Sequence, residues 1–130
     1  MKYVTNTAGG LLGLAFISFS LMYFFNLMPN ETPPPEGSAV AHFFAAVVST
    51  GYMNLVKTCE LLGGILVAIP RTRNIGLLFL GPVIINIAAF HIFVARNATD
   101  PETLITLLII GSLAAFLLWA GRKAFAGLLN

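Results

Sequence analysis

The 130-residue sequence contains very few charged side chains. Charged residues make up 9% of the chain and hydrophobic residues 58%, whereas a typical soluble domain is about 25% charged. So few charges cannot cover the surface of a protein in water, and so much apolar content excludes a disordered tail. Seven basic residues against five acidic ones are too few for a nucleic-acid-binding surface. The composition predicts an integral membrane protein whose first partner is the lipid bilayer.

Cysteine is also nearly absent. Cys59 is the single cysteine of the sequence, so the chain cannot form an internal disulfide, a CxxC redox pair or a cysteine-based zinc site. We expect Cys59 to be a small apolar packing residue, and we expect no metal site.

Long apolar runs predict the transmembrane helices. Three runs reach the roughly 20 residues that a helix needs to cross a bilayer, and they predict helices at about 8–28, 75–95 and 103–120. A fourth apolar segment, 39–69, contains Ser49-Thr50-Gly51, which favours a break near 50–52. We therefore expect an all-α integral membrane four-helix bundle with a broken or extended second helix, in a single transmembrane domain over 1–130.

The first apolar run resembles a secretory signal only superficially. Its 8–28 span is longer than the usual apolar core of a signal, and Pro29 and Glu31 follow it instead of a cleavage site made of small residues. We interpret it as a retained helix.

The distribution of basic residues predicts the orientation. With four spans, one side of the membrane carries most of the basic residues and the other side carries the acidic residues of the loops. The basic side has Lys2, Arg71, Arg73, Arg122 and Lys123, and the other side has Arg96 with Glu31, Glu36, Asp100 and Glu102. The positive-inside rule then places both termini in the cytoplasm. We expect a multi-pass protein of a bacterial or archaeal cytoplasmic membrane.

Lys57 and Glu60 are charged residues inside the second apolar segment. A charge at the centre of a membrane costs about 2.5–3.5 kcal/mol even on the lenient insertion scale. The two residues are three positions apart, which places them on one face of a helix within reach of each other. They are either a self-contained structural ion pair or part of a functional site, and the cost of burying them favours a function.

Four further polar residues are predicted to lie at a similar depth. Counted at about 1.5 Å per residue from the cytoplasmic boundary, Lys57 and Glu60 lie about 20 and 15 Å up the second helix. On the same scale Asn86 and His91 lie about 16 and 24 Å up the third helix. Tyr23 and Asn26 of the first helix reach about 22–27 Å. The sequence therefore predicts a shared polar intramembrane site in the outer half of the bilayer.

The order of these motifs resembles that of DoxX-like small membrane proteins. The resemblance covers nearly the whole chain, with four helices, a proline-rich first loop, a Lys–Glu second helix and an Asn–His third helix. The residues that carry it are Thr50-Gly51-Tyr52, Lys57, Glu60, Gly63-Gly64, Gly81-Pro82-Val83-Ile84-Ile85-Asn86 and Phe90-His91-Ile92-Phe93.

The resemblance implies a small membrane subunit of a redox or quinone-linked system. On that analogy Lys57, Glu60, Asn86 and His91 form the ligand site, quinone is the candidate ligand, and other subunits of a membrane redox complex are the partners. The chain has no haem, flavin or iron–sulfur signature, so it would be at most the membrane subunit of an oxidoreductase.

Two alternatives stay open beside the redox interpretation. One is a non-catalytic assembly or scaffold subunit, in which the polar residues hold the helices in register. The other is a small-molecule or lipid binder or transporter. The pair Gly9 and Gly13 forms a GxxxG spacing, which we interpret as helix packing within the bundle, and an oligomer stays open.

Overall fold

The computed structural model describes residues 1–29 and 32–129. The described residues are helical and contain no strand, which confirms the all-α part of the predicted fold. The elements are α1 (Lys2–Phe24), α2 (Ala39–Ser49), α3 (Tyr52–Ala68), α4 (Arg73–Ala89), the π-helical turn η1 (Phe90–Val94), α5 (Pro101–Ala120), α6 (Arg122–Ala126) and the 3-10 turn η2 (Gly127–Leu129). Glu31, which we assigned to the outer side, lies outside the described residues.

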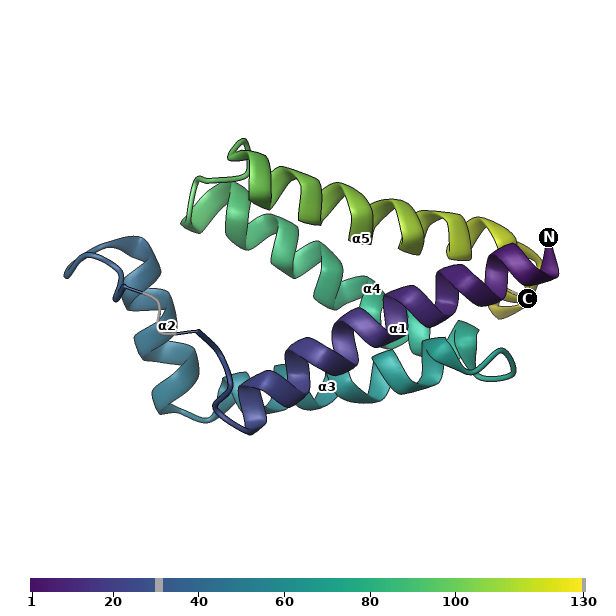
Figure 1. The fold of residues 1–130 in the computed structure, drawn as a ribbon, viewed down its shortest axis with the longest axis horizontal. Coiled ribbons are helices and arrows are strands. Elements are labelled where there is room, and N and C mark those ends of the chain that lie inside the picture. Colours follow the sequence, from purple (N-terminus) through teal and green to yellow (C-terminus); the bar gives the residue numbers. More distant parts are fainter. Residues whose placement is uncertain (30–31, 130) are drawn as a thin grey trace.

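Four long helices share one apolar core. The buried side chains come from α1, α3, α4 and α5, and α3 packs against both α1 and α4. Figure 1 shows these helices running along the long axis of the molecule. The two chain ends and the turn between α3 and α4 lie at one end of the molecule, and α2 lies at the other. The core residues are Ala8, Leu12, Phe16, Val67, Leu77, Leu80, Ile110, Ala114 and Leu117.

Glycines allow α3 to pack closely on both of its neighbours. A Cβ atom added to Gly13 of α1 would lie 2.5 Å from the Gly64 carbonyl oxygen of α3. At the adjacent position of α3, a Cβ atom on Gly63 would lie 2.8 Å from the Leu80 side chain of α4. Close approach of this kind lets helices associate through van der Waals contact, as proposed for the Gly9–Gly13 spacing.

The first helix is shifted towards the N-terminus relative to the prediction. It begins at Lys2 rather than near Ala8, because a helix does not need an apolar side chain at each position and the Thr5 hydroxyl hydrogen-bonds the Met1 carbonyl (2.9 Å). It ends at Phe24 rather than near Met28, because Asn26 has a positive φ of 53° and stops the helix. The apolar run marks the bilayer-compatible stretch, whereas capping determines the helix ends.

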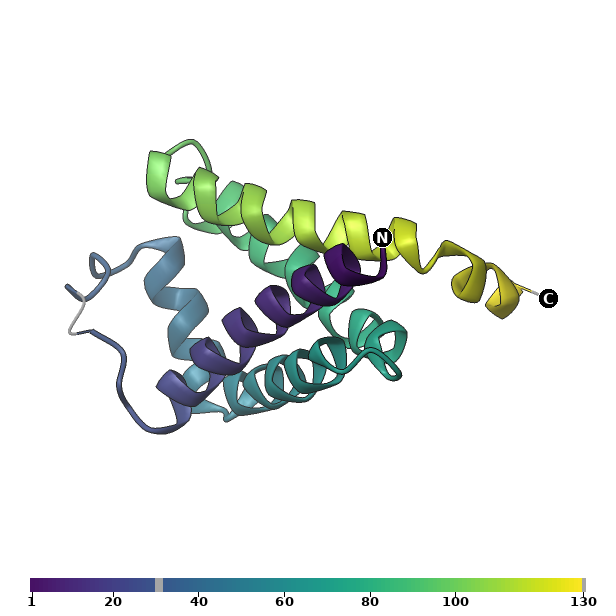
Figure 2. The same ribbon diagram turned by 45° about the vertical axis from the view of Figure 1, so that its right-hand side comes forward.

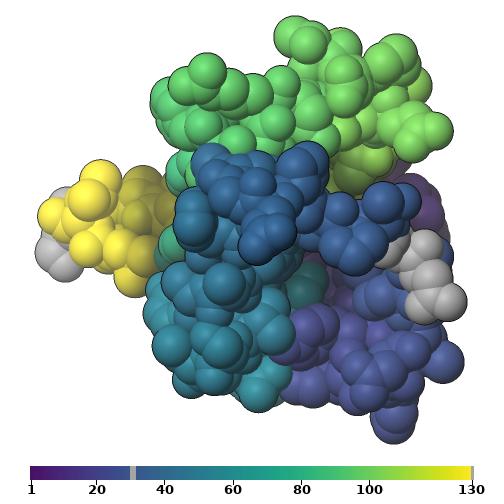
Figure 3. All heavy atoms as spheres, turned by 90° about the vertical axis from the view of Figure 1, so that its left-hand side faces the viewer, coloured from purple at the N-terminus to yellow at the C-terminus, as the bar shows by residue number. Residues whose placement is uncertain are grey.

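The predicted break in the second segment lies at Thr50 and Gly51, where the chain turns by 81° between α2 and α3. Gly51 has a φ of +79°, a conformation that L side chains rarely adopt. Figure 3 views the molecule from the end that carries α2, and there α2 lies between α5 and the paired helices α1 and α3. Its Phe43 ring packs against Phe90 of η1 at a centroid distance of 4.9 Å. The segment is therefore two helices at a large angle and not one tilted rod.

The remaining boundaries follow local signals. The last long helix begins at Pro101, two residues before the predicted 103, because proline at the first helical position and Glu102 in the first turn both favour a helix start. Helix α4 begins at Arg73, two residues before the predicted Ile75, and continues through Pro82. Beyond α5, α6 and η2 extend away from the other helices (Figure 2).

Candidate functional site

Lys57 and Glu60 form an ion pair on α3, as their spacing predicts. The Lys57 Nζ and Glu60 Oε2 atoms are 3.0 Å apart. The Glu60 side chain is 4% exposed and the Lys57 side chain 18%. The carboxylate is therefore enclosed by the fold, while the ammonium group retains partial access to the surroundings.

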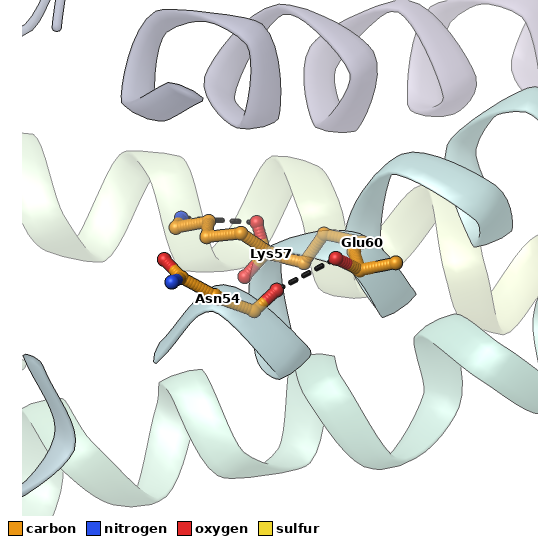
Figure 4. A network of polar contacts seen from close by, with 4 residues as sticks. Asn54, Lys57 and Glu60 are labelled. Atoms are coloured by element: carbon orange, nitrogen blue, oxygen red, sulfur yellow. Dashed lines mark hydrogen bonds and ion pairs between the residues drawn. The ribbon is translucent and has the colours of Figure 1, made fainter. Parts of the chain in front are cut away.

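Tyr23 and Asn54 extend this pair to α1. The Tyr23 hydroxyl donates a hydrogen bond to Asn54 Oδ1 (2.8 Å), and Lys57 Nζ lies 5.9 Å from the centre of the Tyr23 ring. Figure 4 shows Asn54, Lys57 and Glu60 gathered on α3. We call Tyr23, Asn54, Lys57 and Glu60 the polar cluster. It holds hydrogen-bond donors, an acceptor amide and an ion pair where two helices meet.

Ser20 of α1 is buried at about the same height along the helices as the polar cluster. Its hydroxyl is fully buried and has no hydrogen-bond partner among the described residues. Helices α1 and α3 run antiparallel, with Tyr23 in contact with Asn54 and Ile17 in contact with Gly64. Ser20 lies midway between Ile17 and Tyr23, and it is therefore level with Lys57 and Glu60, which lie between Asn54 and Gly64. A buried hydroxyl without a partner is costly, which makes Ser20 a candidate donor to a group bound beside the polar cluster.

Asn26, a predicted site residue, instead caps α1. Its backbone N–H hydrogen-bonds the Tyr23 carbonyl (3.2 Å), and the Leu27 N–H bonds the Met22 carbonyl (2.8 Å). With Asn26 at a φ of 53°, these bonds form a Schellman motif. Asparagine tolerates this left-handed conformation better than most residues do, which explains its place here. The Asn26 side chain is exposed, and it makes no hydrogen bond to the polar cluster within the described chain.

His91 lies in η1 and has a different partner. In the tautomer with hydrogen on Nδ1, His91 donates to Asn97 Oδ1 (2.8 Å), which leaves its Nε2 as an acceptor. Its ring also lines a small cavity of about 250 Å³ together with Glu102, Thr103 and Thr106 of α5. Among the described residues, His91 therefore forms a second polar group between α4 and α5, without a hydrogen bond to Lys57 or Glu60.

Asn86 is exposed on α4 and makes no side-chain hydrogen bond within the described residues. Depth along the helix axis places it level with Glu60, but depth does not determine which way a side chain faces. The predicted single site is thus divided in the structure. Tyr23, Lys57 and Glu60 come together, His91 joins a separate group, and Asn26 and Asn86 point elsewhere.

The sequence-based site lacked several residues that lie in or beside these two groups, among them Asn54, Ser20 and Asn97. Asn54 precedes Lys57 by three positions, so helical spacing alone could have added it to the same face. Ser20 is one of few polar residues in an apolar helix, which is a weak signal. Asn97 lies in a loop, and no periodicity indicates its contact with His91.

The composition of the polar cluster favours proton and hydrogen-bond chemistry. Lys57 can donate to a carbonyl oxygen, Glu60 can accept a proton, and the Tyr23 hydroxyl can do either. The described residues contain no group of three or more histidine, cysteine, aspartate or glutamate side chains that could hold a metal ion.

Comparison with known proteins identifies a relative but no activity. No family model matches the chain, and no solved structure matches it. The uncharacterized protein YwoB of Bacillus subtilis (strain 168) is 28% identical over 101 residues. The match covers 75% of this chain and 62% of YwoB, so the chain spans less than two thirds of the length of that relative.

Proposed function

We propose that the chain is an integral membrane protein with four spans, the second formed by α2 and α3 together. Helices α1, α4 with η1, and α5 are long and apolar enough to cross a membrane, and the bent pair qualifies when counted as one span. Large apolar side chains cover the outside of these helices, as lipid contact requires and water does not favour. Examples are Leu14, Ile75, Ile85 and Ile109, each more than half exposed.

The proposed orientation has both termini in the cytoplasm. The basic residues of the N-terminus, the α3–α4 turn and the region after α5 share one end of the molecule (Figure 1). In this orientation α3, with 17 residues, extends about 25 Å across the bilayer. Lys57 and Glu60 then lie in the outer part of the membrane, near the bend at which α2 joins α3.

Within this protein, the polar cluster is the proposed ligand site of a small membrane subunit in a quinone-linked redox system of the DoxX type. The observation that carries the proposal is the enclosed Lys57–Glu60 pair between apolar helices. Lys57 and the Tyr23 hydroxyl would hydrogen-bond a quinone carbonyl, and Glu60 would exchange the proton that accompanies reduction. The electrons come from a partner subunit, since the chain itself carries no redox-active motif.

The test is the quinone content of the protein purified in its native lipid. We expect a quinone in the wild type, its loss in Lys57→Met and Glu60→Gln, and its retention in Lys123→Met, which removes an equivalent charge from an exposed position. Mass spectrometry of extracted small molecules makes the comparison. A wild-type sample that retains its phospholipids but contains no quinone would refute the proposal that quinone is the ligand.

A structural role is the second candidate, because both partners of the ion pair lie on one helix and the Tyr23–Asn54 bond already joins α1 to α3. Breaking an enclosed pair by removing one partner costs about 3–5 kcal/mol, while replacing both with apolar residues is often neutral. For a purely structural pair, Lys57→Met therefore destabilises the protein and Lys57→Met/Glu60→Met restores it. For a quinone site, the double variant regains stability and still lacks the quinone.

A further inference from the structure

A second polar cavity opens at the opposite end of the molecule from α2. It measures about 380 Å³ and lies where α1 begins, α4 begins and α5 ends. The side chains that give it its character are Lys2, Thr5, Arg73, Asn74, Trp119 and Arg122. None of the residues that line it is acidic.

Within the part of the chain that the structure describes, the basic side chains of this cavity have no acidic partner. In residues 1–29 and 32–129, Lys57–Glu60 is the single ion pair, so no carboxylate lies within 4 Å of the Lys2, Arg73 or Arg122 nitrogens. Three positive charges around one cavity repel each other unless an anion lies between them. The cavity is therefore electrostatically prepared for a negatively charged group.

Arg73 is the most buried of these cations, with only 7% of its surface exposed. Its Nε donates to the Val67 carbonyl (3.1 Å) and its Nη2 to Asn6 Oδ1 (3.2 Å). Both acceptors are neutral, and Nη1 donates to no atom of the described chain. Gly9 makes room for this arrangement, because a Cβ atom there would collide with the Arg73 guanidinium.

A buried guanidinium normally has a paired anion, because its desolvation is expensive. In Arg73 the fold fixes two donors on neutral carbonyl oxygens, while Nη1 has no acceptor in the described chain and the residue lines the cavity. Guanidinium forks bind phosphate oxygens with two parallel hydrogen bonds. The geometry of Arg73 therefore favours a phosphate over a simple halide ion.

Trp119 and Arg122 form the other wall of the cavity. The Arg122 guanidinium lies 4.5 Å from the centre of the Trp119 ring, and its Nη1 donates to the Trp119 carbonyl (2.8 Å). These contacts hold the charge of Arg122 beside the cavity. Tryptophan is enriched at the level of lipid headgroups in membrane proteins, so in the proposed orientation this wall lies at the cytoplasmic headgroup level.

We propose that this cavity binds the phosphate group of an anionic phospholipid from the cytoplasmic leaflet. The phosphate would lie between Lys2, Arg73 and Arg122, with the Asn74 amide as a neutral hydrogen-bond donor, and the acyl chains would follow the apolar surface of the helices. Basic pockets between transmembrane helices on this side bind anionic headgroups by the same chemistry. The proposal rests on membrane insertion but not on the quinone site.

The test is lipid binding by the full-length protein in detergent, measured by native mass spectrometry with added phosphatidylglycerol or phosphatidylcholine. We expect phosphatidylglycerol to bind the wild type several-fold more tightly. Lys2→Gln and Arg122→Gln should each weaken that preference roughly fivefold, the effect of one basic residue near an anionic lipid. The matched control is Arg71→Gln, because Arg71 is exposed at the same end but does not line the cavity.

Each contrary result has a distinct meaning. Equal binding of the two lipids by the wild type would overturn the proposal. So would a loss of the phosphatidylglycerol preference in Arg71→Gln as large as that in Lys2→Gln or Arg122→Gln, because the preference would then come from the general surface charge. Displacement of bound phosphatidylglycerol by inorganic phosphate alone, with no lipid preference left, would overturn the lipid as the source of the phosphate. Quinone content measured on the same samples distinguishes failure of this site from failure of the polar cluster.

Discussion

Replacing Gly13 with alanine tests the close packing of α1 on α3. The new Cβ atom would lie 2.5 Å from the Gly64 carbonyl oxygen and 2.8 Å from the Ala68 Cβ atom. Neither atom can rotate away, so α1 must retreat by about 0.9 Å to reach the 3.4 Å of ordinary van der Waals contact. Overpacking of this kind costs about 1–3 kcal/mol.

Gly10→Ala is the matched control on the same helix. A Cβ atom there meets nothing within 4 Å, and alanine favours a helix over glycine by up to about 1 kcal/mol. Because both variants gain this helix preference, it cancels when they are compared. We therefore expect Gly13→Ala to be less stable than Gly10→Ala by about 1–3 kcal/mol.

The assay is reversible unfolding of the purified protein in mixed detergent, followed by circular dichroism. Crosslinking between cysteines placed on α1 and α3 would report the same displacement independently. Equal stability of the two variants, or a Gly13→Ala protein more stable than the wild type, would refute the packing of α1 against α3 through Gly13.

Three further substitutions test single features. Tyr23→Phe removes the hydrogen bond to Asn54 and should cost about 0.5–1.5 kcal/mol in unfolding experiments, while Tyr3→Phe at an exposed position should cost nothing measurable. Asn26→Gly should preserve the thermal unfolding midpoint, whereas Asn26→Val should lower it by forcing a β-branched side chain into the left-handed conformation. Gly51→Ala should strain the bend between α2 and α3 by about 1–2 kcal/mol and increase proteolysis there. Unchanged proteolysis would contradict the left-handed conformation of Gly51 at this bend.

The polar cluster also has a consequence for how such a protein tolerates variation. Lys57 can change only together with Glu60 without leaving an enclosed charge, since the 3.0 Å pair neutralises both groups. Ser20 has no such constraint, because its hydroxyl has no partner in the described chain. Ser20→Ala should therefore leave stability unchanged or improve it, unless a bound molecule uses the hydroxyl.

Local features of this protein were predictable from its sequence. The length of the apolar runs predicted the long helices, and Ser49-Thr50-Gly51 predicted the break between α2 and α3. The Lys57–Glu60 pair was predictable for the same reason: spacing along one helix places both side chains on one face without reference to any other element.

Features that join different helices were decided by the tertiary structure. Equal depth along two helices says nothing about how each helix is rotated about its axis, and the close contacts through Gly13, Gly63 and Gly64 set that rotation. The rotation brings Tyr23 to Asn54 and leaves Asn86 exposed. The end of α1 turns Asn26 into a cap, and the packing of α4 against α1 encloses Arg73 beside a basic cavity.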